Sequence, residues 1–507
     1  MSKKLFTAKE IPIFYHEPRV DKNTFLTMQT EKASIPKYKD VKDKLPIPVW
    51  QGREDAIDCY YKAWSLAFSN LKKANKKARF VSNYIDTAFN GYLFMWDSSF
   101  IVMFGKYASR FFNFQKTLDN FYSHQLRDGY IPRQISPMTY GAKWSRDDPV
   151  STGPNILAWA EWEYFLSTGD VERLSNVFDA LCGYHNWLKN NRSWQDGSYW
   201  STGWGCGMDN TPRMEACYDP RLSHGFNSWI DATAQQYLNA KILIDMAKVL
   251  KRDSEMAIYL EELELLENII NNKMWDEKTQ FYYDTNRYGK VTGVKSVASY
   301  WTLISGVVPQ DKVQPFVAHL DNENEFKRPN RVPTLSYDHP EYCKEGGYWK
   351  GAIWAPTNYM VLNGLHKYGF DKLAFEIAKD YVNNVVEVYK NRGTLYENYA
   401  PEKADKGDSS KPDFVGWTGL APISVMFEYL FGIHPNNSNN VIDWKINLTE
   451  EHGIKQYPFG DATVDLVCQA RSSQDEEPVI KLTSNKPVTL KIEWNGQTKT
   501  YKDVTKI

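Results

Sequence analysis

The chain has 507 residues, with 61 Lys and Arg residues against 62 Asp and Glu residues and a net charge of −1. This balance argues against a nucleic-acid-binding protein, whose surface normally carries a basic patch. Hydrophobic residues make up 42% of the chain and charged residues 24%, which is typical of a globular protein and excludes a disordered one. No apolar run approaches the roughly 18 residues that span a bilayer, so we expect no association with a membrane.

The first ten residues, MSKKLFTAKE, are basic but lack the apolar core of a secretory leader. The sequence as it stands therefore indicates a cytoplasmic protein, whereas a periplasmic or secreted protein would follow if a leader had been removed. No spacing among the six cysteines or nine histidines resembles a metal site, and no glycine-rich phosphate-binding loop occurs. We expect neither a metal ion nor another cofactor.

Along the chain, residues 1–50 contain several prolines and predict an irregular arm. Between about residues 51 and 434, long segments place apolar residues at helical spacing, and loops rich in Gly, Asp, Pro and Trp separate them. This alternation predicts a mainly α fold, a toroid of helical hairpins. The segments with the clearest helical periodicity are 53–74, 154–166, 171–190, 230–250, 254–271, 371–389 and 420–432.

After residue 434 the pattern changes to short runs of alternating apolar and polar residues. Asn495 and Gly496 lie between two such runs and predict a hairpin turn. Residues 435–507 therefore predict a small β domain, sandwich-like in arrangement. We interpret this domain as a structural appendage rather than as a separate binding module.

Aromatic content is high, with 18 Trp, 32 Tyr and 25 Phe residues that together make 15% of the chain. Aromatic side chains dominate protein cores and also line concave ligand sites. Because many of the tryptophans lie in the long loops, the composition favours a sugar-binding cleft. A large helical core remains the alternative explanation.

Several motifs follow one another through the helical zone: GYLFMWDSSF (91–100), DGYIPRQI (128–135), STGPN (151–155), WSTGWGCGMDNTPRM (200–214), GGYWKGAIWAPTNY (346–359), TLYENYAPE (394–402) and FVGWTGLAP (414–422). Their order resembles glycoside hydrolase families 63 and 37, which contain processing α-glucosidases, mannosylglycerate hydrolases and trehalases. The resemblance covers roughly residues 90–430. It implies an (α/α)6 barrel that hydrolyses glycosidic bonds with inversion of the anomeric configuration.

Inverting hydrolysis needs two carboxyl groups on opposite sides of the scissile bond, one protonated and one ionised. Asp209 follows Trp204 in a Gly-rich loop, where apolar neighbours would raise its pKa. The resemblance implies that Asp209 is the general acid and that Glu397, between two tyrosines, is the general base. Taken alone, either residue has a structural explanation, since Asp in such loops commonly forms turns. Other acids compete with Glu397: Glu345, Glu402 and Asp413.

The resemblance also places Asp97 against sugar hydroxyls, as a hydrogen-bond acceptor. Arg133 and Arg213 are expected to form paired hydrogen bonds with a carboxylate, either a partner's or the substrate's, and Arg213, which closely follows Asp209, has the alternative role of holding that loop in place. Aromatic platforms are the other expected contacts with sugar, although about half of the tryptophans should belong to the core. Segment 151–155 lacks the Arg and Gln of the trehalase pattern, so trehalose is not the favoured substrate. The remaining candidates for substrate binding are Trp96, Arg133, Trp204, Arg213, Tyr348, Trp349, Trp354, Asn358 and Trp417.

We therefore expect an exo-acting, inverting hydrolase that cleaves an α-linked glucoside or related sugar from a disaccharide or oligosaccharide. Two alternatives stay open. A polysaccharide lyase would use a Tyr or His base beside an Arg, and a non-catalytic sugar-binding protein would stack sugars without turnover. The sequence determines neither the sugar and linkage nor the oligomeric state. The candidates for the lyase chemistry are Tyr140, Arg146, His185 and His224.

Overall fold

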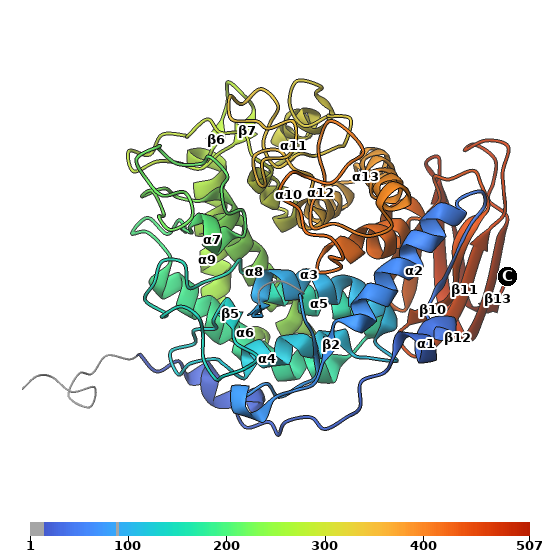
Figure 1. Cartoon of the computed structure of the whole chain (residues 1–507), viewed down its shortest axis with the longest axis horizontal. Helices are drawn as coiled ribbons and strands as arrows, with labels where there is room; N and C mark the ends of the chain where they lie inside the picture. The colour runs from blue at the N-terminus through green and yellow to red at the C-terminus, as the bar shows by residue number, and fades with distance from the viewer. Residues whose placement is uncertain (1–14, 88–90) are drawn as a thin grey trace, which may run out of the picture.

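The structure is a computed structural model that describes residues 15–87 and 91–507 (Figure 1). The predictions made for residues 1–14 lie outside the described residues. Within the described ranges, no helix combines the length and the apolar character needed to cross a bilayer.

The helical zone is confirmed, and most helices lie within a few residues of their predicted bounds. Two long helices were not predicted from periodicity, namely α3 (Met95–Gly105) and α12 (Ala355–Lys367). All residues of α3 are buried, so it has no polar face to produce an amphipathic pattern. The other helices are α2 (Glu54–Ser69), α4 (Asp119–Tyr122), α5 (Leu157–Thr168), α6 (Val171–Asn191), α7 (Gly203–Cys206), α8 (Ile230–Val249), α9 (Ala257–Lys273), α10 (Trp301–Ser305), α11 (Gln310–Ala318), α13 (Asp371–Arg392) and the π-helix η11 (Ala421–Leu430).

The inner helices contact one another in chain order. Helix α3 packs on α5, α5 on α8, α8 on α10, and α10 on α12. The last inner segment, η10 (Thr418–Leu420) followed by η11, contacts both α12 and α3 and closes the ring of contacts. Helices α2, α6, α9 and α13 each pack against an inner helix, and Figure 1 shows the helical body beside the red C-terminal sheet.

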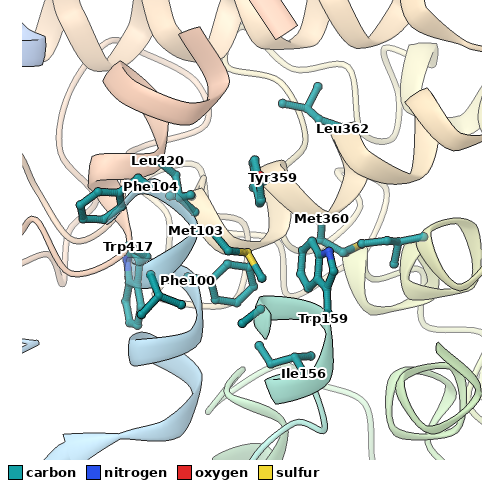
Figure 2. Close-up of a cluster of buried hydrophobic side chains, with 14 of the residues drawn as sticks. Phe100, Met103, Phe104, Ile156, Trp159, Tyr359, Met360, Leu362, Trp417 and Leu420 are labelled. Atoms are coloured by element: carbon teal, nitrogen blue, oxygen red, sulfur yellow. The ribbon is translucent and has the colours of Figure 1, made fainter. Parts of the chain in front are cut away.

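A hydrophobic cluster fills the space between α3, α5 and α12 (Figure 2). The indole of Trp159 stacks on the ring of Tyr359, with centroids 5.9 Å apart and planes 22° apart. Such aromatic pairs contribute about 0.5–1.5 kcal/mol beyond the burial of their area. The cluster therefore holds the first, second and fifth inner helices at fixed distances. Its labelled members are Phe100, Met103, Phe104, Ile156, Trp159, Tyr359, Met360, Leu362, Trp417 and Leu420.

The C-terminal strands are confirmed and form one sheet of seven strands in the order β1-β10-β11-β12-β9-β8, with β13 also paired to β12. All pairs are antiparallel except β9 with β12. Asn495 and Gly496 have φ values of 38° and 75°, as the predicted hairpin turn requires. The strands are β1 (Ile47–Trp50), β8 (Ile433–Asn436), β9 (Val441–Lys445), β10 (His452–Phe459), β11 (Ala462–Cys468), β12 (Ile480–Trp494) and β13 (Gln497–Lys506).

Two features differ from expectation. Two apolar and polar alternating runs, at 478–485 and 487–496, predict two separate strands. In the structure they form a single 15-residue strand, β12, whose pairing with β13 shifts register between Thr483 and Val488. The N-terminal segment is not wholly irregular, because β1 pairs with β10 at the edge of this sheet. An exposed strand edge offers unpaired backbone groups, and β1 satisfies those of β10. Short helices precede β1: η1 (Pro18–Lys22), η2 (Thr24–Leu26), α1 (Tyr38–Val41) and η3 (Lys42–Lys44).

A buried charge cluster joins four segments of the helical body. The Lys106 ammonium, which follows α3, lies 3.0 Å from a Glu428 carboxylate oxygen of η11 and 3.6 Å from Glu163 of α5. The hydroxyls of Tyr107 and of Tyr359 on α12 donate hydrogen bonds to Glu428 at 2.6 and 2.7 Å. Buried charges cost free energy unless they are paired and hydrogen-bonded, and Glu428 meets both conditions.

Replacing Glu428 by Gln should lower the free energy of unfolding by about 3 kcal/mol, because the buried Lys106 then loses the nearer and more deeply buried of its two countercharges. Urea denaturation followed by circular dichroism measures the change. The matched control is Glu264→Gln on the exposed face of α9, which should change stability by less than about 0.5 kcal/mol. Equal stability of the two variants would contradict the structural role of Glu428.

Candidate active site

A cavity of about 190 Å³ lies beside the N-terminal ends of α3 and α5. We call it the first cavity. Its volume is below the roughly 300–1,000 Å³ of sites for drug-sized ligands, so it suits a small group. The residues predicted to form the site that line this cavity are Trp96, Asp97, Arg133, Trp204, Asp209, Tyr348, Trp349 and Trp417.

A short loop after α7 positions Asp209. Gly207 in this loop has φ +81°, and a Cβ there would lie 3.1 Å from the Trp96 ring, so only glycine fits without strain. Asn210 ties the same loop to the segment that carries Tyr348. Its amide nitrogen donates to the Gly347 carbonyl at 3.0 Å, and its amide oxygen accepts from the Trp349 amide at 2.9 Å. Asn210 thereby fixes the loop that carries Asp209 to the segment that carries Tyr348 and Trp349.

Glu397 is buried next to the first cavity and connects to it through Tyr348. The Tyr348 hydroxyl donates to Glu397 Oε1 at 3.3 Å, and the Lys411 amide donates to Oε2 at 3.3 Å. The Trp417 indole donates to the Glu397 carbonyl at 2.8 Å. The cavity wall therefore holds both the side chain and the backbone of Glu397.

Tyr348 has a strained backbone. Its φ of +64° lies in the left-handed region, which costs a bulky residue about 1–3 kcal/mol. The Trp354 indole donates to the Tyr348 carbonyl at 3.0 Å, and the two rings meet edge-on with centroids 5.0 Å apart. These contacts hold Tyr348 in the conformation that directs its hydroxyl to Glu397.

Three carboxyl groups at or beside the first cavity affect one another, and the Arg133 guanidinium lies near two of them, Asp97 and Asp209. Burial raises the pKa of Asp209 to about 7, and the charge of Arg133 partly opposes this shift. Burial also raises the pKa of Glu397 to about 7, with the charge of Asp209 adding to the effect. The pKa of Asp97 rises well above its usual value because of burial, with the charges of Glu397 and Asp209 adding to it. A carboxyl group that stays protonated near neutral pH is what a general acid requires.

Two hydrogen-bond donors at the first cavity have no acceptor within the described part of the chain. They are the indole nitrogen of Trp96 and Nε of Arg133, both buried. Arg133 uses another nitrogen to donate to the Trp204 carbonyl, which fixes the guanidinium beside Asp209. Buried donors normally have partners, so these two are available to a polar ligand.

Of the two roles considered for Arg213, its position favours holding the acid loop over contact with substrate. Arg213 is 2% exposed and does not line the first cavity. Its guanidinium donates two hydrogen bonds to Asp231, at 2.7 and 2.8 Å, and two to Asp284, at 2.8 and 2.6 Å. Both carboxylates come from distant parts of the sequence, so Arg213 holds the acid loop in place rather than reaching the cavity.

Trp354 and Asn358 also lie outside the lining of the first cavity, contrary to expectation. The Trp354 ring stacks behind Trp349, with centroids 3.8 Å apart and planes 9° apart. Asn358 is buried on α12 and donates to the Trp354 carbonyl at 3.1 Å. Trp354 therefore supports the wall from behind, while Trp349 faces the cavity.

None of the candidates for lyase chemistry lines the first cavity. His185 is buried and pairs with Glu262 at 3.0 Å, and His224 packs against Trp200 with ring centroids 5.0 Å apart. Tyr140 and Arg146 line a different cavity. In residues 15–87 and 91–507, no group of three or more His, Cys, Asp or Glu side chains is arranged to hold a metal ion.

Sequence reasoning missed part of the lining. Lys143 and Trp144 come from residues 136–150, the loop between the motifs at 128–135 and 151–155. The available sequence signal in this loop is its composition, a Trp among Gly, Asp and Pro residues. The Trp144 indole donates to Gln134 at 3.3 Å and lies 5.6 Å from the Trp204 ring. The complete set of missed lining residues is Phe94, Gln134, Lys143, Trp144, Gly153, Pro154 and Gly207.

Comparison with known proteins identifies a family. A family model described as the mannosylglycerate hydrolase MGH1-like glycoside hydrolase domain matches residues 90–418. An uncharacterised protein of Borreliella burgdorferi is 24% identical over 428 residues, which are 82% of this chain and 88% of that protein. A probable mannosyl-oligosaccharide glucosidase of Schizosaccharomyces pombe is 26% identical over 293 residues, which are 54% of this chain and 34% of the yeast protein.

Solved structures share the fold. A crystal structure of the family 63 mannosylglycerate hydrolase of Thermus thermophilus in complex with glucose superimposes with a TM-score of 0.59 at 20% sequence identity. The superposition covers 72% of this chain and 99% of the other. The matched family segment contains Asp97, Asp209 and Glu397.

Replacing Asp209 by Asn should stabilise the protein above about pH 7. Because the pKa of Asp209 is about 7 when folded and near 4 when unfolded, the folded state binds more protons between these values. The contribution of Asp209 to the free energy of unfolding therefore falls as the pH rises from about 4 to about 7. Above about pH 7 the buried, ionised carboxylate destabilises the folded state. We expect Asp209→Asn to gain about 4 kcal/mol at pH 8, since each of the roughly three pKa units corresponds to about 1.4 kcal/mol, and to gain nothing near pH 4, as measured by urea denaturation.

The control for this measurement is Asp461→Asn, whose side chain is 88% exposed. It should change stability little at either pH, because an exposed ion pair contributes little. If Asp209→Asn also left the free energy of unfolding unchanged at pH 8, the claim that an unfavourable carboxylate is buried at the first cavity would be contradicted.

Proposed function

The chain belongs to the family of mannosylglycerate hydrolase MGH1-like glycoside hydrolase domains, and from this premise we propose that it is an inverting, exo-acting hydrolase of an α-linked glucoside or related sugar. The chain is thus a glycoside hydrolase, and its substrate contains a sugar. The observation that carries the finer proposal is the placement of the two carboxyl groups: Asp209 lines the first cavity, and Glu397 lies behind the lining residue Tyr348, whose hydroxyl donates to it at 3.3 Å.

We also propose that the helical body is an (α/α)6 barrel. The closed sequence of contacts from α3 through α5, α8, α10 and α12 to η11 supports six inner helices. In this proposal residues 51–434 form the catalytic barrel, residues 435–507 the β domain, and residues 1–50 an arm whose strand β1 joins that domain. The barrel places the N-terminal ends of α3 and α5 at the same end, beside the first cavity.

In the proposed reaction, protonated Asp209 donates its proton to the glycosidic oxygen as the bond to the anomeric carbon breaks. Ionised Glu397 removes a proton from a water that attacks the anomeric carbon from the opposite face. Inverting enzymes place the two carboxyl groups about 6.5–9.5 Å apart to accommodate that water. Tyr348 supports this assignment because its hydroxyl meets Glu397 at the cavity wall and can orient the carboxylate toward the water.

The other polar groups of the first cavity are proposed to hold the terminal sugar. Asp97 would accept hydrogen bonds from sugar hydroxyls, while the free donors of Trp96 and Arg133 would bond to sugar oxygens. Trp349 and Trp417 offer faces for the apolar side of the ring. The lyase alternative is disfavoured because its candidate residues lie away from this cavity.

The first test follows the anomer of the product. Hydrolysis of an α-glucoside in D₂O, followed by proton NMR within the first minutes, should show β-glucose before mutarotation mixes the anomers. This outcome follows from single displacement by water. The initial appearance of α-glucose would contradict the inverting mechanism, and the absence of any hydrolysis of α-linked glucosides would contradict the substrate class.

The second test separates the roles of the two carboxyl groups. Asp209→Asn should reduce kcat on an unactivated disaccharide by about 10²–10⁴, because the leaving oxygen then departs without a proton. The same variant should retain much more activity on α-glucosyl fluoride, whose leaving group needs less protonation. Glu397→Gln should impair both substrates, since water must be activated in either case.

Thermal unfolding of both variants provides the control for correct folding. The assignment of Asp209 would be wrong if Asp209→Asn and the wild type hydrolysed the disaccharide at equal rates. A large loss on the fluoride for Asp209→Asn and none for Glu397→Gln would reverse the two roles.

A further inference from the structure

A second cavity adjoins the first. Its volume is about 880 Å³, more than four times that of the first cavity. Trp144 lines both cavities and separates them. Its indole is fixed by the hydrogen bond to Gln134 and by contact with Trp204, so one rigid aromatic side chain forms the boundary.

The second cavity combines an exposed aromatic ring with charged hydrogen-bonding groups. Tyr140 is 49% exposed although it is a large aromatic residue. Its ring stacks on His124 with centroids 5.2 Å apart and planes 30° apart, and the Arg79 guanidinium lies 5.0 Å from its centroid. These contacts hold Tyr140 in place, and the exposed part of the residue lines the second cavity.

The polar part of this lining is also ordered. Arg146 donates to Asp128 at 2.6 Å, and the Trp187 indole donates to the same carboxylate at 3.1 Å. Fixed aromatic faces beside a carboxylate and a guanidinium suit a ligand with apolar faces and many hydroxyl groups. Sugar units have this chemistry, whereas a purely apolar ligand would leave these charged groups without hydration.

We propose that the second cavity binds the sugar units that follow the cleaved bond, so that the substrate is an oligosaccharide whose terminal residue enters the first cavity. The chain of sugars passes Trp144, and the next units pack on Tyr140. This inference rests on the proposed function. The shared lining residue Trp144 and the difference between the two cavity volumes carry it.

The experiment compares short and long substrates. The probes are α-glucosyl fluoride, which needs only the first cavity, and α-linked glucose oligosaccharides of two to five units in the linkage that the enzyme cleaves fastest. For the wild type, kcat/KM should rise with chain length, mainly through a lower KM. Tyr140→Ala should lower the ratio of kcat/KM for the pentasaccharide to that for the disaccharide about tenfold, since stacking on one aromatic ring is worth about that factor.

Two further variants serve as controls. Tyr140→Phe keeps the ring and should keep the wild-type ratio. Tyr288→Ala removes a tyrosine that is 73% exposed and lines neither cavity, and it should leave both substrates unaffected. This inference would be overturned if Tyr140→Ala and the wild type had the same ratio of kcat/KM for the pentasaccharide to that for the disaccharide. It would also be overturned if kcat/KM of the wild type did not depend on chain length. In both cases, hydrolysis of the fluoride would still support the proposed function.

A loss in Tyr140→Ala that is equal for the fluoride and the pentasaccharide, at unchanged melting temperature, would also overturn it, because the effect would then lie in the first cavity. Failure of the wild type to hydrolyse any of the probes would overturn the proposed function and this inference together.

Discussion

The position of the site depends on a carboxylate that is buried away from it. Glu428 needs positive charge and hydroxyl donors, since an isolated buried charge is strongly unfavourable. It obtains them from Lys106 and Tyr107, just after α3, and from Tyr359 on α12. These bonds fix the C-terminal end of α3, while its N-terminal end carries Trp96 and Asp97 to the first cavity. The geometry of the cavity is therefore determined by contacts at the other end of the helix.

Charge is distributed differently at the two ends of α3. At the Glu428 end, two carboxylates share one ammonium and two tyrosine hydroxyls, and the cluster is satisfied. At the cavity, the charge of Arg133 only partly offsets the burial of Asp97 and Asp209, the charge of Lys411 only partly offsets that of Glu397, and all three pKa values are raised. The first arrangement stabilises the fold and the second costs stability, a compromise common at active sites, where reactivity needs groups that remain unsatisfied.

Sequence reasoning predicted the helical zone and the C-terminal strands well, because periodicities of 3.6 and 2 residues report burial directly. It failed for α3, whose uniform burial removes the periodic signal. Motif order led to residues that line the first cavity, but it left two roles open for Arg213, contact with substrate and support of the acid loop. An arginine in a motif looks the same whether its partner is a ligand or a carboxylate, and the partners of Arg213 are distant in sequence. The boundary formed by Trp144 between two cavities has no local sequence signal.

The pairing of β1 with β10 has a consequence for synthesis of the chain. Ile47 pairs with Lys455, so the edge of the C-terminal sheet is completed by a strand made more than 400 residues earlier. On the ribosome β1 has no partner until almost the whole chain has emerged, and contacts of such long sequence separation form slowly. Strand β1 therefore pairs only after the helical body, which lies between β1 and β10 in the sequence, has been synthesised.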